Sequence, residues 1–148
     1  MNIINIVYVG KKTSPIYAQL IDPYVKRLQA DYKINWRMIA PDHGTEQESK
    51  IVLSVIKLTD FVIVLDKRGR IIDNQLLASK LEQIATSGRQ LTFVIGGAYG
   101  LNQAVLDRAD FVWSLSDLVL THQMVRLILI EQIYRSQAII RQHPYHHE

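Results

Sequence analysis

The carboxyl-terminal stretch 143–148 (HPYHHE) gathers the side chains of this chain that are best suited to chemistry. It holds three of the five histidines together with Tyr145. Imidazole nitrogens bind metals, but no second ligand cluster in the sequence has supporting spacing, so we predict no metal site. A tyrosine ring stacks on bases, and histidines supply hydrogen-bond donors to RNA. The pattern therefore favours a tail that faces RNA.

A second group of polar residues follows one helical stretch near the carboxyl end. Arg126 and Arg135 are nine residues apart, about two and a half helical turns, so they face different sides of the helix. They cannot both serve one site in one chain unless a neighbouring subunit contributes. His122 comes just before this stretch, and a histidine there is more typical of a cap or a packing residue than of a catalyst.

Two short apolar stretches end in turns that suit ligand binding. Leu91–Ile95 (LTFVI) is followed at once by Gly96-Gly97, and Phe111–Ser114 (FVWS) is followed by 115–120 (LSDLVL). Ligands of parallel α/β sheets bind outside the carboxyl ends of strands, so we expect both turns to border one crevice, the candidate active site. The glycines either form a tight turn that needs positive φ or let a ligand approach bare backbone. They form neither a dinucleotide fingerprint nor a P-loop.

Charged residues that follow the apolar stretch Phe61–Leu65 have two interpretations. Asp66, Lys67 and Arg68 form either a solvated loop or a rim that contacts phosphate or the polar end of a cofactor. Asp117, in the LSDLVL stretch, is likewise either a turn residue or a ligand contact. The sequence shows no Ser-His-Asp arrangement, no nucleophilic cysteine and no carboxylate pair typical of hydrolases.

The elements that position these residues follow from hydrophobic periodicity. Apolar stretches alternate with amphipathic ones, which predicts an α/β fold with a mostly parallel sheet and helices on both faces. We expect Pro23 to kink or divide the first helix, Asp73-Asn74 to cap the third, and loops at 41–45 and 66–70. The predicted strands are Ile3–Val9, Ile34–Ile39, Phe61–Leu65, Leu91–Ile95 and Phe111–Ser114, and the predicted helices are Pro15–Gln29, Glu46–Lys57, Asn74–Ala85, Leu101–Ala109 and Gln123–Arg141.

The last predicted helix, Gln123–Arg141, is apolar almost all around in its first half. A helix with a single core contact needs only one apolar stripe, so this helix should be buried on two sides. Its second burial surface is either a symmetric partner chain or the core of the same chain, and the pattern favours neither.

Length and composition set broad limits. A chain of 148 residues forms one domain with a substantial core. No stretch reaches the roughly 18 apolar residues that a membrane span needs, and the amino terminus lacks the basic region of a signal peptide. Cysteine is absent, which excludes disulfides and thiolate metal sites, and we expect a cytoplasmic protein. The net charge of +3 permits a nucleic-acid partner without requiring one.

Three motifs together resemble one family. The stretches IGGAYGL, LSDLVLTHQMVRLILIEQIYRSQAII and HPYHHE are similar to the RlmH (YbeA-like) family of SPOUT-class ribosomal RNA methyltransferases, and INIVYVGK and FVIVLD lie where that family has equivalents. The resemblance implies one SPOUT methyltransferase domain over residues 1–148, a C-terminal trefoil knot, a homodimer and S-adenosyl-L-methionine as cofactor. It further implies N3-methylation of pseudouridine 1915 in 23S rRNA, with the assembled ribosome as substrate.

The resemblance also implies roles for individual residues. Arg135, Tyr145 and His146 would be catalytic, with the tail reaching the cofactor pocket of the partner subunit. Thr121 stands where the family usually has proline, and His147 stands where lysine or arginine is commoner, which would weaken a phosphate contact. The implied cofactor contacts are Leu65, Gly96, Leu115, Ser116, Asp117, Leu118, Val119 and Leu120.

Two other functions are compatible with the sequence. A SPOUT methyltransferase acting on tRNA or on another rRNA base would methylate free RNA. A non-catalytic RNA-binding or ribosome-associated module would keep the basic rim but would not bind S-adenosyl-L-methionine. A nucleotide-binding oxidoreductase is disfavoured because the glycine fingerprint and its acidic partner are missing.

Overall fold

The structure is a computed structural model that describes residues 1–41 and 44–147. Part of the predicted loop 41–45 and the last residue of the tail lie outside the described residues. Parallel strands alternate with helices along the whole described chain, so the predicted α/β fold with a parallel sheet is confirmed. The trefoil knot implied by the family resemblance stays a prediction.

The sheet has the strand order β2-β1-β4-β3-β5. The strands with the longest runs of buried residues, β1 and β4, are neighbours in the inner part of the sheet. Helices cover both faces of the sheet there. In chain order the elements are β1 (Asn2–Val9), α1 (Pro15–Leu28), β2 (Tyr32–Ile39), α2 (Thr45–Val55), β3 (Phe61–Arg70), α3 (Asn74–Ser87), β4 (Leu91–Ile95), α4 (Gln103–Arg108), β5 (Phe111–Trp113) and α5 (His122–Ile140).

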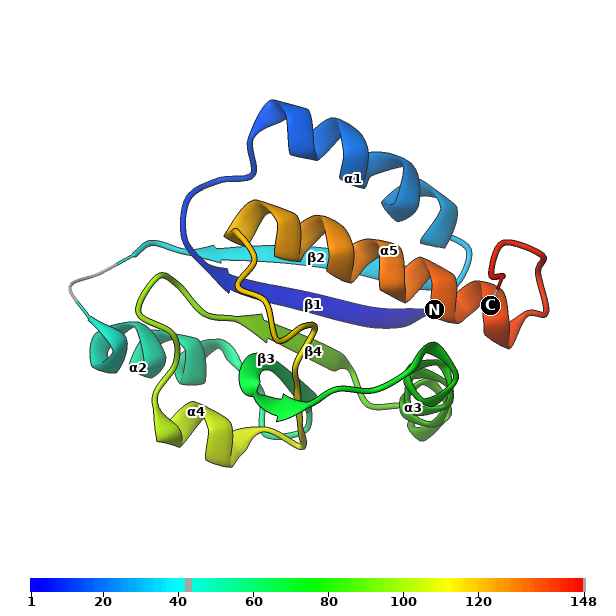
Figure 1. The fold of residues 1–148 in the computed structure, drawn as a ribbon. Helices are drawn as coiled ribbons and strands as arrows, with labels where there is room; N and C mark the ends of the chain where they lie inside the picture. The colour runs from blue at the N-terminus through cyan, green and yellow to red at the C-terminus, as the bar shows by residue number, and fades with distance from the viewer. Residues whose placement is uncertain (42–43, 148) are drawn as a thin grey trace.

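Helices cover the two faces of the sheet unequally. Helices α1, α3 and α5 pack on one face, where their apolar side chains join Ile4, Ile6 and Phe93 of the sheet. Helices α2 and α4 pack on the other face, against Val7 and Val94. Figure 1 shows α2 toward the arrowhead ends of β1 and β2. Alternate residues of each strand therefore feed two separate cores.

Helix α5 owes its two-sided apolar character to the core of its own chain. It lies on the sheet with α1 and α3 as its helical neighbours, and Leu129, Ile130 and Ile133 are fully buried there. Burial in the core of the same chain thus accounts for the apolar character of these three residues. Leu127 and Ile128 stay partly exposed, so a partner chain remains a prediction for the rest of the surface of α5.

Helix ends follow the local chemistry that the sequence predicts. Asp73 accepts a hydrogen bond from the Leu76 amide at 2.8 Å and caps α3, and Thr121 accepts one from the Met124 amide and caps α5. Gly88 ends α3 with a left-handed φ of 78°, a conformation that costs glycine little. Thr121 therefore supplies a cap at the position where the family usually has proline.

Pro23 does not divide the first helix, so of the two predicted alternatives division is wrong and a kink stays a prediction. Helix α1 continues through Pro23 without interruption to Leu28. A proline removes one backbone donor inside a helix. Burial of Ile21 and Leu28 on the sheet side holds the helix together across that position.

The predicted exit loop 66–70 is also wrong, because it belongs to β3. The pairing with β5 shifts register there, and Leu65 and Arg70 both pair with Trp113. A Cβ atom on Gly69 would lie 2.5 Å from the backbone carbonyl atoms of Val112. Glycine lets β3 return against β5, and the Arg70 carbonyl then accepts a hydrogen bond from the Ser114 amide at 2.9 Å.

Candidate active site

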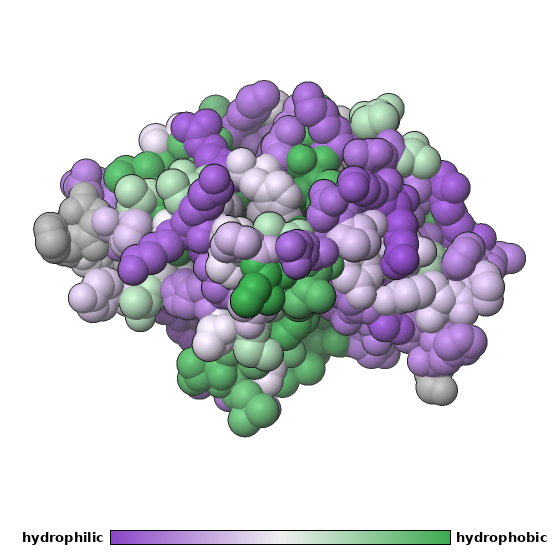
Figure 2. Space-filling view, turned by 90° about the horizontal axis from the view of Figure 1, so that it is seen from above, coloured by the Kyte–Doolittle hydropathy of each residue, from purple (hydrophilic) through white to green (hydrophobic). Residues whose placement is uncertain are grey.

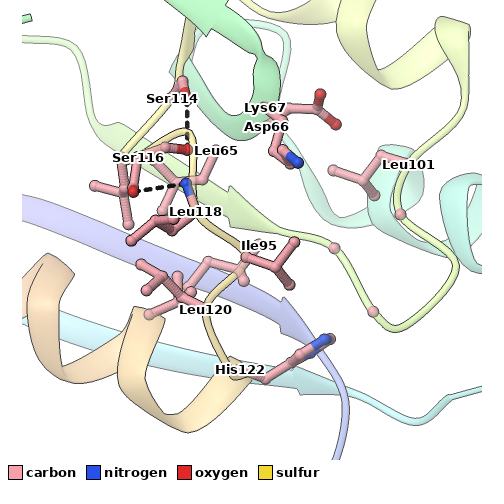
Figure 3. A pocket seen from close by; sticks show the side chains of 16 residues that line it. Leu65, Asp66, Lys67, Ile95, Leu101, Ser114, Ser116, Leu118, Leu120 and His122 are labelled. Atoms are coloured by element: carbon pink, nitrogen blue, oxygen red, sulfur yellow. Dashed lines mark hydrogen bonds between the residues drawn. The ribbon is translucent and has the colours of Figure 1, made fainter. Parts of the chain in front are cut away.

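A crevice of about 200 Å³ opens at the carboxyl ends of β3, β4 and β5. It lies where the sequence predicts a ligand site, between the glycine turn after β4 and the loop after β5. Figure 3 shows Leu118, Leu120 and Ile95 gathered at its centre, with His122 at one end. The cofactor residues implied by the resemblance that line it are Leu65, Gly96, Leu115, Ser116, Leu118, Val119 and Leu120.

Asp117 is the implied cofactor residue that does not line the crevice, and its side chain is exposed to solvent. Asp66 and Lys67, which the sequence analysis treats as a possible rim, do line it. His122 was expected to cap or pack, yet it lines the crevice as the first residue of α5. Its position directly after the ligand loop is the signal that would have identified it.

Other lining residues were missed by the sequence analysis. They are apolar or small residues next to the predicted turns, so their proximity to the strand ends is the only available signal. They are Ile95, Leu101, Ser114 and Val125, whereas Gly97 and Gly100 line the crevice as part of the predicted glycine turn.

Two serine hydroxyls hold the loop after β5 in shape. The Ser114 hydroxyl donates to the Ser116 carbonyl at 3.2 Å, and the Ser116 hydroxyl accepts from the Leu118 amide at 2.9 Å. These local bonds satisfy polar groups of the loop while its leucine and valine side chains stay exposed, Leu118 at 75% and Val119 at 82%. The loop therefore presents apolar side chains on an ordered backbone.

For the S-adenosyl-L-methionine that the family resemblance implies as cofactor, we predict that Ser116→Ala weakens binding about fivefold, because it removes one hydrogen bond worth about 1 kcal/mol from the loop. Isothermal titration calorimetry of both proteins with the cofactor measures the change. Ser54→Ala is the matched control, since the Ser54 hydroxyl also bonds the local backbone but lies on α2, outside the crevice. Equal affinities for Ser116→Ala and the unchanged protein would contradict the prediction.

The glycine turn 96–100 combines one positive φ with close packing, so the interpretation as a tight turn is confirmed at Gly100. Only Gly100 in this turn has positive φ, at 76°, and its amide donates to the Gly97 carbonyl at 3.0 Å. A Cβ on Gly96 would lie 2.8 Å from Cγ of Leu101, and one on Gly97 would lie 3.0 Å from Cγ1 of Val9. Glycine at positions 96 and 97 therefore leaves space for the side chains of Leu101 and Val9.

An ion pair fixes the charged rim of the crevice. Nε and Nη2 of Arg68 each donate to a different carboxylate oxygen of Asp66 at 2.8 Å, and Nη2 also donates to the Leu101 carbonyl at 3.0 Å. These hydrogen bonds lower the pKa of the Asp66 carboxyl below its usual value. Asp66 therefore stays ionised beside the crevice, and Arg68 ties β3 to the segment after the glycine turn.

The three implied catalytic residues lie together at the carboxyl end of α5. Nη1 of Arg135 donates to Nδ1 of His146 at 3.1 Å, and the Tyr145 hydroxyl donates to Oε1 of Glu131 at 3.1 Å. Glu131 also accepts from Nε of Arg135 at 3.0 Å. The sequence analysis missed Glu131, although its spacing of four residues from Arg135 is typical of an ion pair on one helix face.

Tyr145 is held as a neutral phenol. Burial, a hydrogen bond with Tyr24 and the nearby Glu131 carboxylate all raise the pKa of Tyr145 above its ordinary value. Its ring packs edge-on against Tyr134 at a centroid distance of 4.8 Å. Tyr145 can therefore donate a hydrogen bond at neutral pH but cannot act as a phenolate base.

The implied catalytic residues and the crevice are far apart in one chain. His122 and Val125 line the crevice at the start of α5, whereas Arg135 lies thirteen residues after His122. At 1.5 Å per residue this is roughly 20 Å along the helix axis. The structure thus brings each of the two groups together internally but does not bring them to each other within one chain.

Arg126 occupies a different environment from Arg135, as the helical spacing predicts. It is buried, its guanidinium carbon lies 4.0 Å from the ring centroid of Tyr8, and Nη1 donates to the Thr13 hydroxyl at 3.2 Å. Burial lowers the pKa of Arg126. Arg126 therefore fastens α5 to the segment that leaves β1 and does not reach the tail.

The described part of the chain has neither a cluster of metal ligands nor a helix suited to a membrane. Over residues 1–41 and 44–147, no group of three or more histidine, cysteine, aspartate or glutamate side chains is placed to hold a metal ion. None of the helices in this part of the chain has both the length and the apolar character needed to cross a membrane.

Fold and crevice together define the class: a parallel α/β protein with a crevice outside the carboxyl ends of its strands, which is where proteins of this class bind ligands. Comparison with known proteins gives the family. Residues 1–146 match the family described as predicted SPOUT methyltransferases, and the chain belongs to this family.

Similar proteins agree with this assignment. A protein of Polynucleobacter asymbioticus named ribosomal RNA large subunit methyltransferase H is 39% identical over 98% of this chain and 99% of its own. A protein of the same name from Bacillus pumilus is 39% identical over 97% and 98%. These relatives confirm the resemblance inferred from the motifs.

One solved structure supports the fold alone. A probable methylase family protein from Haemophilus influenzae Rd KW20 superposes with a TM-score of 0.59 at 13% identity, covering 98% of this chain and 70% of that protein.

Proposed function

We propose that this protein transfers a methyl group from S-adenosyl-L-methionine to N3 of pseudouridine 1915 in 23S rRNA, within assembled ribosomes in the cytoplasm. The observation that carries the proposal is the crevice at the carboxyl ends of β3, β4 and β5, in a chain similar over nearly its full length to ribosomal RNA large subunit methyltransferases H. One domain, residues 1–148, would perform the reaction.

The crevice has the chemistry that S-adenosyl-L-methionine requires. Its leucine, isoleucine and valine side chains suit the faces of an adenine ring, while the backbone of the ordered loop supplies donors and acceptors. Its volume of about 200 Å³ is below the ~300–1,000 Å³ of typical ligand sites. We therefore expect the exposed loop 115–120 to move outward when the cofactor binds.

When bound, S-adenosyl-L-methionine supplies a methyl group carried by a positively charged sulfur. The imide of the target base must lose its N3 proton, so the protein has to stabilise negative charge and accept that proton. The hydrogen bond to Glu131 raises the pKa of Arg135, so its guanidinium remains a fixed cation. Arginine only donates, so Nδ1 of His146 accepts this hydrogen bond, and the ring would have to release it to take the N3 proton.

A homodimer would unite the two separated groups. A groove of about 470 Å³ runs between α1 and α5, lined by Leu20, Leu127 and Ile128 and also by Glu131, which holds Arg135 and Tyr145. Figure 2 looks onto the side of α1 and shows apolar surface in the middle of the molecule. A partner chain on this groove would lie directly beside the tail, which supports a site made from the crevice of one subunit and the tail of the other.

We predict that Ile128→Glu prevents dimer formation, because it places an unpaired carboxylate in the apolar groove at a cost of about 3 kcal/mol or more. Sedimentation equilibrium measures the mass, and methylation of ribosomes should be lost with the dimer. Ile71→Glu is the control, since Ile71 is 59% exposed and lies outside the groove. A dimeric Ile128→Glu protein would place the partner surface elsewhere.

The proposed activity is tested with S-adenosyl-L-methionine labelled in its methyl group. The label is followed into intact ribosomes, separated subunits and naked rRNA, and the modified nucleotide is mapped by mass spectrometry. We expect label on one large-subunit pseudouridine, in assembled ribosomes only. Label on free rRNA or tRNA would favour a different substrate, and neither label nor cofactor binding would favour a recognition module without catalysis.

A further inference from the structure

A second cavity, of about 450 Å³, lies on the sheet face covered by α2 and α4. It occupies the amino-terminal halves of β1 and β2, beyond the part of this face that packs against α2. It shares no lining residue with the active-site crevice. We call it the polar groove, and its polar lining residues are Asn5, Asn35, Lys57, Asp60, Gln90 and Thr92.

The floor of the polar groove is a hydrogen-bonded row of side chains across three parallel strands. Asn5 pairs in register with Asn35 on one side and Thr92 on the other. Nδ2 of Asn35 donates to Oδ1 of Asn5 at 3.2 Å, and Nδ2 of Asn5 donates to Oε1 of Gln90 at 3.1 Å and Oγ1 of Thr92 at 3.3 Å. Strands of parallel sheets are normally apolar on both faces. This row is therefore an exception that needs a reason.

Asp60 ends the row and carries an unused acceptor. Its side chain is nearly inaccessible, with 3% of the residue exposed. Oδ2 accepts from the Thr92 hydroxyl at 3.1 Å and from the Lys57 amide at 3.0 Å. Within the part of the chain that the structure describes, Oδ1 has no hydrogen-bond partner. A buried acceptor without a donor costs about 1–3 kcal/mol, so the groove is built to receive a donor at this atom.

Cations surround this acceptor. Arg37 and Lys57 line the groove with exposed side chains. Arg89 and Arg108 donate to the backbone carbonyl of Asp60 itself, at 2.8 and 3.1 Å. The groove therefore offers one deep acceptor for a hydroxyl or amine, with positive charge at its rim for neighbouring anions.

We infer that the polar groove binds the ribose-phosphate backbone of RNA, with a ribose 2′-hydroxyl donating to Oδ1 of Asp60 and flanking phosphates meeting Arg37 and Lys57. The 2′-hydroxyl is the donor that RNA has and DNA lacks, and phosphates match the rim cations. The inference rests on the proposed function, which brings rRNA to this chain. Thr92 and Gly96 are four residues apart on β4 and its turn, roughly 13 Å, so the groove holds a nucleotide other than the methylated one.

The change Asp60→Asn tests Oδ1 as an acceptor while it keeps the hydrogen bonds to Lys57 and Thr92. The amide oxygen can keep the two bonds that Oδ2 accepts, while the amide nitrogen replaces Oδ1. The hydroxyl then loses its charge-assisted hydrogen bond to a carboxylate and can only accept a weaker neutral one. The probe is a short oligouridylate and its deoxy counterpart, followed by NMR through the side-chain amide signals of Asn5, Asn35 and Gln90. Asp110→Asn is the control, because Asp110 also accepts from a backbone amide but is exposed and outside the groove.

We expect the RNA oligomer to shift these amide signals in the unchanged protein and in Asp110→Asn, and to bind Asp60→Asn at least fivefold more weakly. The DNA oligomer should bind all three proteins equally and weakly. Unmoved amide signals, or equal shifts with RNA and DNA, would overturn the inference. The unchanged protein's methylation of ribosomes is assayed separately, so failure of the proposed function is distinguished from failure of the groove.

The salt dependence of RNA binding tests the rim cations. Lys57→Gln and Arg37→Gln should each reduce the slope of log affinity against log salt by about 0.7 for a single-stranded probe. Lys50→Gln is the matched control, because Lys50 lies exposed on α2 outside the groove. Slopes unchanged by both rim variants would exclude phosphate contacts at this site.

Discussion

Replacing Arg135 with alanine should lower the turnover number for ribosome methylation by about 100- to 1,000-fold, the range seen when one preorganised stabiliser of developing charge is removed. Arg135 holds His146 at 3.1 Å and is itself fixed by Glu131. Its loss removes the cation and releases the histidine. The dissociation constant of S-adenosyl-L-methionine should not change, because Arg135 acts on the target base in the proposed dimer, whereas the crevice residues hold the cofactor.

Steady-state methylation of ribosomes and cofactor titration measure these two quantities. Arg141→Gln is the matched control, since Arg141 follows the same helix but forms its ion pair with Asp31. Its turnover should stay within a factor of about two of the unchanged protein, as expected for an exposed ion pair. If Arg135→Ala methylates ribosomes as fast as Arg141→Gln, the tail cluster is not the catalytic group.

Mixed dimers show which subunit supplies the tail. Arg135→Ala is mixed and refolded with Leu118→Glu, which puts a carboxylate into the apolar crevice at an exposed position. If each site combines one crevice with the partner's tail, half of the dimers are mixed and each has one intact site, so roughly a quarter of the activity returns. No recovery would mean that the crevice and the tail of the same chain act together.

Replacing Gly69 with alanine should destabilise the protein by about 3 kcal/mol, the upper end of overpacking costs. The new Cβ would lie 2.5 Å from the Val112 carbonyl atoms and 2.7 Å from the Trp113 amide nitrogen. All of these are backbone atoms of β5, so no side chain can turn aside to relieve the contact. Strand β5 must move, and with it the loop that begins at Ser114 and lines the crevice.

Thermal unfolding and cofactor titration measure this effect together. At 2–4 °C per kcal/mol for a chain of this size, the melting temperature should fall by roughly 6–12 °C, and cofactor affinity should fall with it. Gly88→Ala separates sterics from backbone conformation, because Gly88 has φ of 78° but open space around its Cβ position. It should cost about 1 kcal/mol and leave cofactor affinity unchanged. Equal behaviour of the two variants would contradict the steric argument.

Local sequence patterns were sufficient for most of the fold and for the position of the crevice. Alternating apolar and amphipathic stretches predict every strand and helix of the described chain, with small errors at their ends except in β3, which continues to Arg70 through the predicted loop. The caps at Asp73 and Thr121 follow from short-range hydrogen bonding. The crevice follows from a general rule of parallel sheets, since both turns come directly after strands. The opposite placement of Arg126 and Arg135 follows from helical geometry alone.

Contacts between distant segments could not be derived in this way, because they depend on which residues the fold brings within a few ångströms. Gly69 is explained only by the β5 backbone, and Gly96 only by Leu101. The same holds for the polar row that joins Asn5, Thr92 and Asp60 from three parts of the chain. Hydrophobic periodicity specifies which face of an element is buried but not its partner, so these long-range hydrogen bonds and steric limits appear only in the folded chain.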